Sequence, residues 1–174
     1  MSGVQAREMG GIGRWMMILA WVLLLVLLSF LFSGILDKQN NPNQNPVTQR
    51  DDRGALQVVL KRNRSGHYVA SGRINGHPVQ FLLDTGATDV AVSDELAEKL
   101  DLPRGQALYS QTANGTVRSW QTRLSEVGLG AITLSDVRAS VLPTMAGDEV
   151  LLGMSFLKQL EWTQKDDQLT LRKL

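Results

Sequence analysis

The sequence of 174 residues contains no cysteine. This absence excludes disulfide bonds, thiolate metal sites, a cysteine nucleophile and a lipid anchor on cysteine, while it leaves the redox compartment open. Histidine is scarce, because His67 and His77 are the two in the chain, and they lack the spacing of metal ligands. Motifs of serine hydrolases, zinc proteases and phosphate-binding loops are also missing. We therefore expect neither a metal nor another cofactor.

Charge of either sign is not in excess, since 18 Lys and Arg residues accompany 17 Asp and Glu residues, for a formal net charge of +1. This balance gives no reason to expect a nucleic acid or an acidic polymer as a partner. The apolar content of 43% is ordinary for a globular chain. The length leaves room for one domain and an appendage.

The appendage is an apolar segment near the N-terminus. Trp15–Leu36 has no charged residue, and as an α-helix it would measure about 33 Å, enough to cross the apolar core of a bilayer. Two arginines precede the segment, whereas an aspartate and a lysine cancel directly after it. The positive-inside rule then places residues 1–14 in the cytoplasm and the bulk of the chain outside it, in the periplasm or its equivalent. We predict a single-pass protein of the inner (cell) membrane; a signal peptide cleaved near Ser33-Gly34 is the alternative.

The segment that follows, residues 37–54, is rich in Asn, Gln and Pro and has no apolar periodicity. This composition predicts a flexible polar tether. The globular domain is expected to begin at Ala55 and to continue to Leu174.

The expected domain consists of short apolar runs separated by turn signals, of which Asn75-Gly76 and Asn114-Gly115 are the strongest. Helical spacing is limited to Ser93–Leu100 and Ser155–Leu160. The pattern predicts a mainly β fold, a closed barrel or a sandwich, with one or two short helices. We expect strands or hairpins at residues 56–60, 68–74, 79–83, 90–92, 108–124, 126–142 (turning at Gly128 and Gly130), 150–154, 162–163 and 168–172.

One stretch, Phe81–Val92, combines an apolar strand with an acidic turn. A carboxylate at the end of a buried strand, here Asp84, is costly unless its charge is hydrogen-bonded or shared. Thr85 offers a hydroxyl, and Gly86 lets the backbone turn so that its amides face the carboxylate. The residues are equally consistent with a built carboxylate site and with a loop aspartate that caps the next turn.

The run Leu82–Ala87 resembles the active-site motif of aspartic proteases in the single-domain, retropepsin-like form. This family follows its Asp-Thr-Gly with a hairpin flap and then with an apolar pair that ends in glycine. The same order occurs here, and the resemblance covers residues 55–174, with the bacterial membrane-tethered group as its nearest form. Met154 departs from the viral members, which commonly carry Arg after this glycine. The matching residues are Asp84, Thr85, Gly86 and Ala87 of the motif, Thr112, Ala113, Asn114 and Gly115 of the flap, and Leu152 and Gly153 of the apolar run.

The resemblance implies a closed retropepsin-like barrel and an endopeptidase that acts on peptide or protein substrates. Such proteases hold two carboxylates together, one protonated and one ionised, and these activate a water molecule that attacks the peptide carbonyl. The chain has a single Asp-Thr-Gly, which implies a homodimer with Asp84 from each protomer. By the same resemblance, Thr85 would interlock across the two-fold axis, Gly86 would donate its N–H toward the carboxylates, and Ala87 would leave room for the substrate backbone.

Two alternatives remain open at this point. The fold could serve as a catalytically inert module for peptide binding or assembly, or as a structural β domain in which Asp84 is a turn residue. The intact Asp84-Thr85-Gly86 argues mildly against both.

Overall fold

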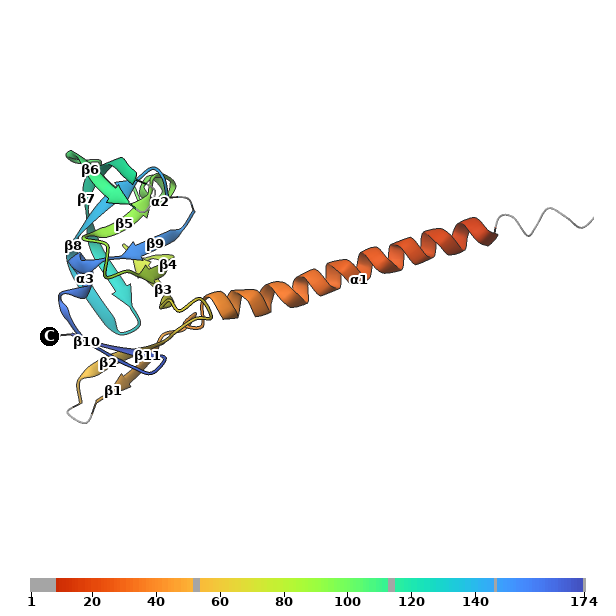
Figure 1. The fold of residues 1–174 in the computed structure, drawn as a ribbon, viewed down its shortest axis with the longest axis horizontal. Helices are drawn as coiled ribbons and strands as arrows, with labels where there is room; N and C mark the ends of the chain where they lie inside the picture. The colour runs from red at the N-terminus through yellow and green to blue at the C-terminus, as the bar shows by residue number, and fades with distance from the viewer. Residues whose placement is uncertain (1–8, 52–53, 113–114, 146, 174) are drawn as a thin grey trace, which may run out of the picture. The chain divides into compact units, whose positions relative to one another are not determined.

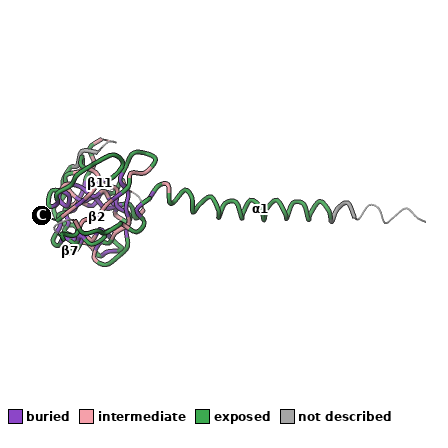
Figure 2. The backbone as a smooth tube through the Cα atoms, turned by 90° about the horizontal axis from the view of Figure 1, so that it is seen from below, coloured by how far each residue is buried: buried purple, intermediate pink, exposed green. Residues whose placement is uncertain are grey.

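The computed structural model describes residues 9–51, 54–112, 115–145 and 147–173. Helix α1 (Met9–Asn40) is followed by a compact unit, Gln39–Leu174, which begins within its last turn. The described part of α1 includes one segment long and apolar enough to cross a membrane, Gly13–Asn40, with a mean hydropathy of 2.7. None of its most apolar stretch is buried (Figure 2). Its apolar side chains therefore lack a protein environment within the described chain.

The compact unit is mainly β, as the sequence predicts, and its strands form two sheets. The smaller sheet has the order β1-β2-β11-β10, and the larger has the order β3-β4-β9-β5-β8-β7-β6 (Figure 1). Their bounds are β1 (Val47–Arg50), β2 (Leu56–Lys61), β3 (Val69–Ile74), β4 (His77–Leu83), β5 (Val90–Ser93), β6 (Ala107–Thr112), β7 (Gly115–Leu129), β8 (Ile132–Leu142), β9 (Glu149–Leu152), β10 (Leu160–Lys165) and β11 (Gln168–Lys173).

The larger sheet closes into a barrel because β3 also pairs with β7, through Arg73 opposite Gly128 and Ile74 opposite Val127. Strand β9 lies between β4, to which it is parallel, and β5, to which it is antiparallel. The turn between β4 and β5 therefore joins two strands that are not neighbours in the sheet and that are held together by β9. The largest fully buried side chains are Phe81, Phe156, Leu60, Ile74, Leu124, Leu129, Leu152 and Leu171.

The smaller sheet covers one part of the barrel with an apolar face. Val58 and Leu60 of β2 and Leu171 of β11 are completely buried, while the residues between them are partly exposed. The turn between β7 and β8 packs against this sheet, because a side chain at Gly130 would meet Val58. Gly130 has a φ of +57°, so the turn is there, and Gly128 lies inside β7 rather than in the turn.

The two short helices differ from each other in how well the sequence predicts them. Helix α2 (Asp94–Lys99) begins where expected, because the Ser93 hydroxyl accepts a hydrogen bond from the Leu96 N–H at 3.0 Å. Helix α3 (Met154–Leu157) is a single turn and ends before the expected Leu160, since Leu160 already pairs with Lys173 in the β10–β11 hairpin.

The expectation of a flexible tether over residues 37–54 is wrong for most of its length. Residues 37–40 continue α1, and Val47–Arg50 forms β1 along the edge of β2. Between them, Asn41 and Asn43 are almost completely buried. The Asn43 side chain donates to the carbonyls of Lys61 and Val69 and accepts from the Lys61 N–H, at 2.7–2.8 Å. The polar composition reflects hydrogen bonding to the barrel, and Ala55 is not the start of the folded unit.

Candidate active site

Asp84 lies directly after β4, where the strand leaves the barrel. The parallel pairing of β4 with β9 continues one residue beyond Leu83 opposite Leu152, because the Asp84 N–H donates to the Leu152 carbonyl at 3.2 Å. The main chain of Asp84 is therefore fixed by the sheet. Its side chain is only half-buried, and Thr85 and Gly86 are exposed. The carboxylate thus lies at the surface, on a main chain that the sheet holds in place.

The turn at Gly86 bends the chain around the Asp84 carboxylate. The Gly86 N–H donates to Asp84 Oδ1 at 2.8 Å. A Cβ atom at residue 86 would lie 3.1 Å from the same oxygen, so a side chain there would crowd the carboxylate. A turn-capping aspartate would make the same hydrogen bond. The geometry accommodates both interpretations of Asp84, and the choice between them depends on the surroundings of the loop.

The far side of this loop is bound to the start of α3. The Met154 N–H donates to the Ala87 carbonyl at 2.8 Å, and the Ser155 N–H donates to the Thr88 carbonyl at 2.9 Å. Gly153 has no room for a side chain, because a Cβ atom would clash with the carbonyls of Ala87 and Asp89. The glycine that the sequence singles out after the apolar run is therefore required by its close contact with the Asp84 loop.

Ser155 is a further part of this support, which the sequence analysis did not identify. It is 4% exposed, its hydroxyl donates to the Arg138 carbonyl at 2.7 Å, and the same hydroxyl accepts from the Val90 N–H at 2.9 Å. One side chain thus joins α3, β8 and the end of the loop. The sequence offers one signal for this role, because Ser155 is a single hydroxyl residue inside an apolar run, where an exposed side chain is not expected.

The expected flap corresponds to the β6–β7 hairpin. Thr112 pairs with Gly115 at its end, and Gly115 has a φ of +106°, which favours glycine. Ala113 and Asn114, the two central residues of the expected turn, lie outside the described residues. The hairpin and the sheet that contains β1 lie at opposite ends of the compact unit (Figure 1).

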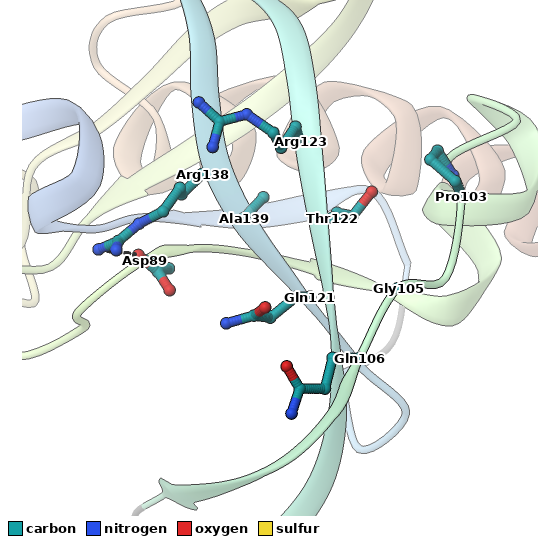
Figure 3. Close-up of a pocket in the computed structure, with 9 residues that line it drawn as sticks. All are labelled: Asp89, Pro103, Gly105, Gln106, Gln121, Thr122, Arg123, Arg138 and Ala139. Atoms are coloured by element: carbon teal, nitrogen blue, oxygen red, sulfur yellow. Dashed lines mark ion pairs between the residues drawn. The ribbon is translucent and has the colours of Figure 1, made fainter.

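A cavity of about 360 Å³ lies between the Asp84 loop and the base of this hairpin (Figure 3). Asp89, the last residue of the loop before β5, contributes to one wall, and Gly105 and Gln106, which lead into β6, contribute to another. The Arg138 guanidinium lies 3.1 Å from the Asp89 carboxylate. Arg123, also at the cavity, is bound by both carboxylate oxygens of Asp136. These hydrogen bonds hold the pKa of Asp136 below its ordinary value and raise the pKa of Arg123.

Comparison with protein families places most of this architecture among known proteins. The family described as "gag-polyprotein putative aspartyl protease" matches residues 70–159, which include β4, the Asp84 loop, the β6–β7 hairpin and α3. A crystal structure of a retropepsin-like aspartic protease from Rickettsia conorii superposes with a TM-score of 0.56 at 25% identity, over 74% of this chain and 94% of that one.

Two curated relatives are similar in sequence. A Sinorhizobium protein, described by its position in the 5′ region of cobV, is 36% identical over 126 residues, which are 70% of this chain and 54% of that protein. A Rickettsia prowazekii protein is 29% identical over 117 residues, or 65% of this chain and 49% of that protein. The chain thus spans about half the length of the curated relatives it matches.

Proposed function

Since the chain belongs to the retropepsin-like aspartic protease family, we propose that it is an endopeptidase whose active form is a homodimer with one Asp84 from each protomer. The observation that carries the proposal is the Asp84 loop. Its carboxylate is accessible and is oriented by Gly86, while the rest of the loop is fixed by β9 and α3. A site shared between two chains requires each chain to hold one carboxylate at its surface on a main chain that is fixed by the fold.

The chemistry needs a second carboxylate, and the chain supplies one Asp-Thr-Gly. Two carboxyl groups a few ångströms apart do not both ionise, because their negative charges would repel each other, so one of the pair stays protonated. The ionised carboxylate takes a proton from a water molecule, which attacks the carbonyl carbon of the peptide bond. The protonated carboxyl donates a hydrogen bond to the oxyanion that develops, and a proton then passes to the leaving nitrogen. A two-fold axis beside Asp84 provides both groups from one sequence.

The exposed Thr85 supports an interface at this position. Its side chain is not used to stabilise its own loop in any hydrogen bond found among the described residues, and it stands next to Asp84. A hydroxyl both donates and accepts, so two copies of Thr85 can bond across the axis. The half-buried Ala87 leaves space beside the carboxylate for an extended substrate.

The central test replaces Asp84 by asparagine in the full chain. Asp84→Asn keeps an oxygen that can accept from Gly86, so the loop and the thermal unfolding temperature should change little while peptide cleavage is lost. The control is to measure unfolding and cleavage on the same preparation. Cleavage by a folded Asp84→Asn protein would rule out the proposed mechanism.

Mixing the two proteins tests the shared site separately. When equal amounts of the original chain and Asp84→Asn are exchanged to equilibrium, random pairing leaves about one quarter of the dimers with two aspartates. Activity should then fall to about half of what the same amount of the original chain gives alone, because only half of the original chains have an intact partner. A site complete in one chain predicts no loss on mixing.

We also propose that α1 anchors the protein in a membrane, with residues 1–14 in the cytoplasm and the protease domain outside it. The apolar, exposed length of Gly13–Asn40 and the positions of Arg7 and Arg14 support this topology. A reporter that is active only in the cytoplasm should be silent when it is fused after Leu174. An active reporter would reverse the orientation, and release of the domain into the soluble fraction would favour a cleaved signal peptide.

A further inference from the structure

The cavity beside the Asp84 loop has charged and amide groups on one side. In Figure 3 the side chains of Gln106 and Gln121 lie on the same side of β7 as Asp89 and Arg138. Both glutamines are exposed, so their amide N–H groups are available. The cavity also adjoins the loop of the proposed catalytic aspartate and the base of the hairpin that would cover a substrate. Since Asp89 lies five residues after Asp84 on the same loop, an extended peptide that follows this loop from Asp84 would bring a side chain to the cavity.

Arg138 is a charged group of the cavity that a ligand can reach. Its side chain is 54% exposed, whereas that of its partner Asp89 is 20% exposed. The Asp89 oxygen nearest to it makes no aligned hydrogen bond with any described group, so the two interact as an ion pair at 3.1 Å. A guanidinium has five N–H donors in a planar fork that fits a carboxylate. Within the described chain, no other acid is paired with Arg138.

Arg123 lines the same cavity but is in a different state. Asp136 binds it with both carboxylate oxygens, and the Asp136 carbonyl accepts from it as well. Its fork is therefore occupied, and its charge is neutralised locally. The groups left to meet a ligand are the free donors of Arg138 and the amides of Gln106 and Gln121. Each glutamine amide offers an accepting oxygen as well as N–H donors, so the feature that favours a carboxylate here is the guanidinium of Arg138, which is more exposed than its partner Asp89.

We propose that this cavity binds an acidic side chain of the substrate and that Arg138 is the residue that selects it. The proposal rests on the proposed protease function, since the ligand is a side chain of the peptide held at Asp84. A glutamate side chain would approach the exposed edge of the guanidinium opposite Asp89. The two glutamine amides would donate further hydrogen bonds to the same carboxylate.

The test uses the full chain in detergent micelles and a set of peptides derived from one cleaved peptide. Each residue within about four positions of the cleaved bond, or roughly 14 Å of extended chain, is replaced in turn by Glu, Gln or Lys. At one position or two adjacent ones, kcat/KM for Glu should exceed that for Gln and for Lys by about tenfold, as a charge-assisted hydrogen bond provides. Glutamine is the matched neutral side chain, because it has nearly the shape of glutamate.

Substitutions at Arg138 connect the preference to the cavity. Arg138→Gln should remove the difference between Glu and Gln, and Arg138→Glu should reverse the order so that Lys is preferred. Neither change touches the main-chain carbonyl that Ser155 binds. Arg73→Glu is the control, since it makes the same change in net charge on β3 and lines no part of the cavity. Thermal unfolding verifies each fold, and if Arg138→Glu does not fold, Arg138→Gln alone decides.

The outcomes separate this proposal from the proposed function. Cleavage of all peptides without a charge preference, or a preference that persists in Arg138→Gln, would overturn the acidic site and leave the protease intact. If no peptide is cleaved, the protease function falls. The affinities of labelled Glu, Gln and Lys peptides for the Asp84→Asn protein then decide the cavity's selectivity, and equal affinities would reject it.

Discussion

Replacing Asn43 by alanine tests whether the segment after α1 is part of the folded unit. The Asn43 side chain makes three hydrogen bonds to main-chain groups: it donates to Lys61 O at 2.8 Å and to Val69 O at 2.7 Å, and it accepts from Lys61 N at 2.7 Å. Residue 43 is 6% exposed. Its side chain therefore joins β2 of the smaller sheet to β3 of the barrel.

The size of the effect follows from the groups that lose their partner. A buried main-chain group left without a hydrogen bond costs about 1–3 kcal/mol, and three such groups would cost several times that if none met water. Lys61 is exposed, so water can reach its N–H and carbonyl more easily than it can reach Val69. We therefore expect Asn43→Ala to lower the free energy of unfolding by about 3 kcal/mol.

The assay is chemical unfolding of the full chain in detergent micelles, followed by the fluorescence of its tryptophans. Hydrogen exchange gives a second measurement, because the Ser71 N–H donates to the Asn43 carbonyl at 3.0 Å and should exchange faster in the variant. Asn45→Ala is the matched control, since Asn45 is exposed in the same segment. An Asn43→Ala effect within about 0.5 kcal/mol of the Asn45→Ala effect would show that the segment is a tether after all.

Two further substitutions test the support of the site and the charges beside it. Gly153→Ala should lower the free energy of unfolding by about 1–3 kcal/mol and reduce cleavage, because its Cβ would push against the carbonyls of Ala87 and Asp89 in the Asp84 loop. Gly128→Ala is the control, since a Cβ at Gly128 meets its nearest atom at 3.8 Å. Thermal unfolding and kcat/KM are measured for both variants, and equal effects would contradict the prediction. Asp136→Asn should cost stability at neutral pH but not in strong acid. The hydrogen bonds from Arg123 lower the folded-state pKa of Asp136, so its ionised form stabilises the fold above the ordinary pKa and loses this effect as the pH falls through the lowered value. Unfolding titrations from about pH 2 to pH 7 measure the difference, and a gap that does not close in acid would refute the assignment. Asparagine tolerates the left-handed φ of +55° at residue 136, which removes backbone strain as an explanation.

The sequence predicts those parts of the fold where local chemistry and burial agree. Asn75-Gly76 forms a tight turn because both residues have positive φ, and Ser93 begins a helix because its hydroxyl caps it. The Asp-Thr-Gly turn is of the same kind, since its main hydrogen bond joins residues two apart, Gly86 to Asp84. Each of these features is encoded within a few neighbouring residues.

The parts that sequence reasoning missed depend on distant residues. The composition of residues 37–54 matches that of a solvated linker, and nothing local indicates that Asn43 meets Lys61 and Val69. Ser155 likewise has its purpose only through Val90 and Arg138. The residue type does not show whether a polar side chain is exposed or is buried and bound to distant main-chain groups. Its burial depends on which segments the fold brings together.

The corrected boundary changes how a dimer can form at a membrane. If α1 spans the bilayer, residues 37–40 are all that separate the apolar Leu36 from the buried Asn41, so each protease unit stays close to the membrane surface along the sequence. Two anchored copies related by a two-fold axis must keep the same side toward the bilayer, which is possible only if that axis runs along the membrane normal. The shared site at Asp84 would lie on this axis. Anchoring would therefore raise the effective concentration of the two halves and limit the dimer to arrangements whose axis runs along the membrane normal. A fragment that begins at Ala55 loses both advantages together with β1 and both buried asparagines, and its inactivity would say nothing about the catalytic role of Asp84.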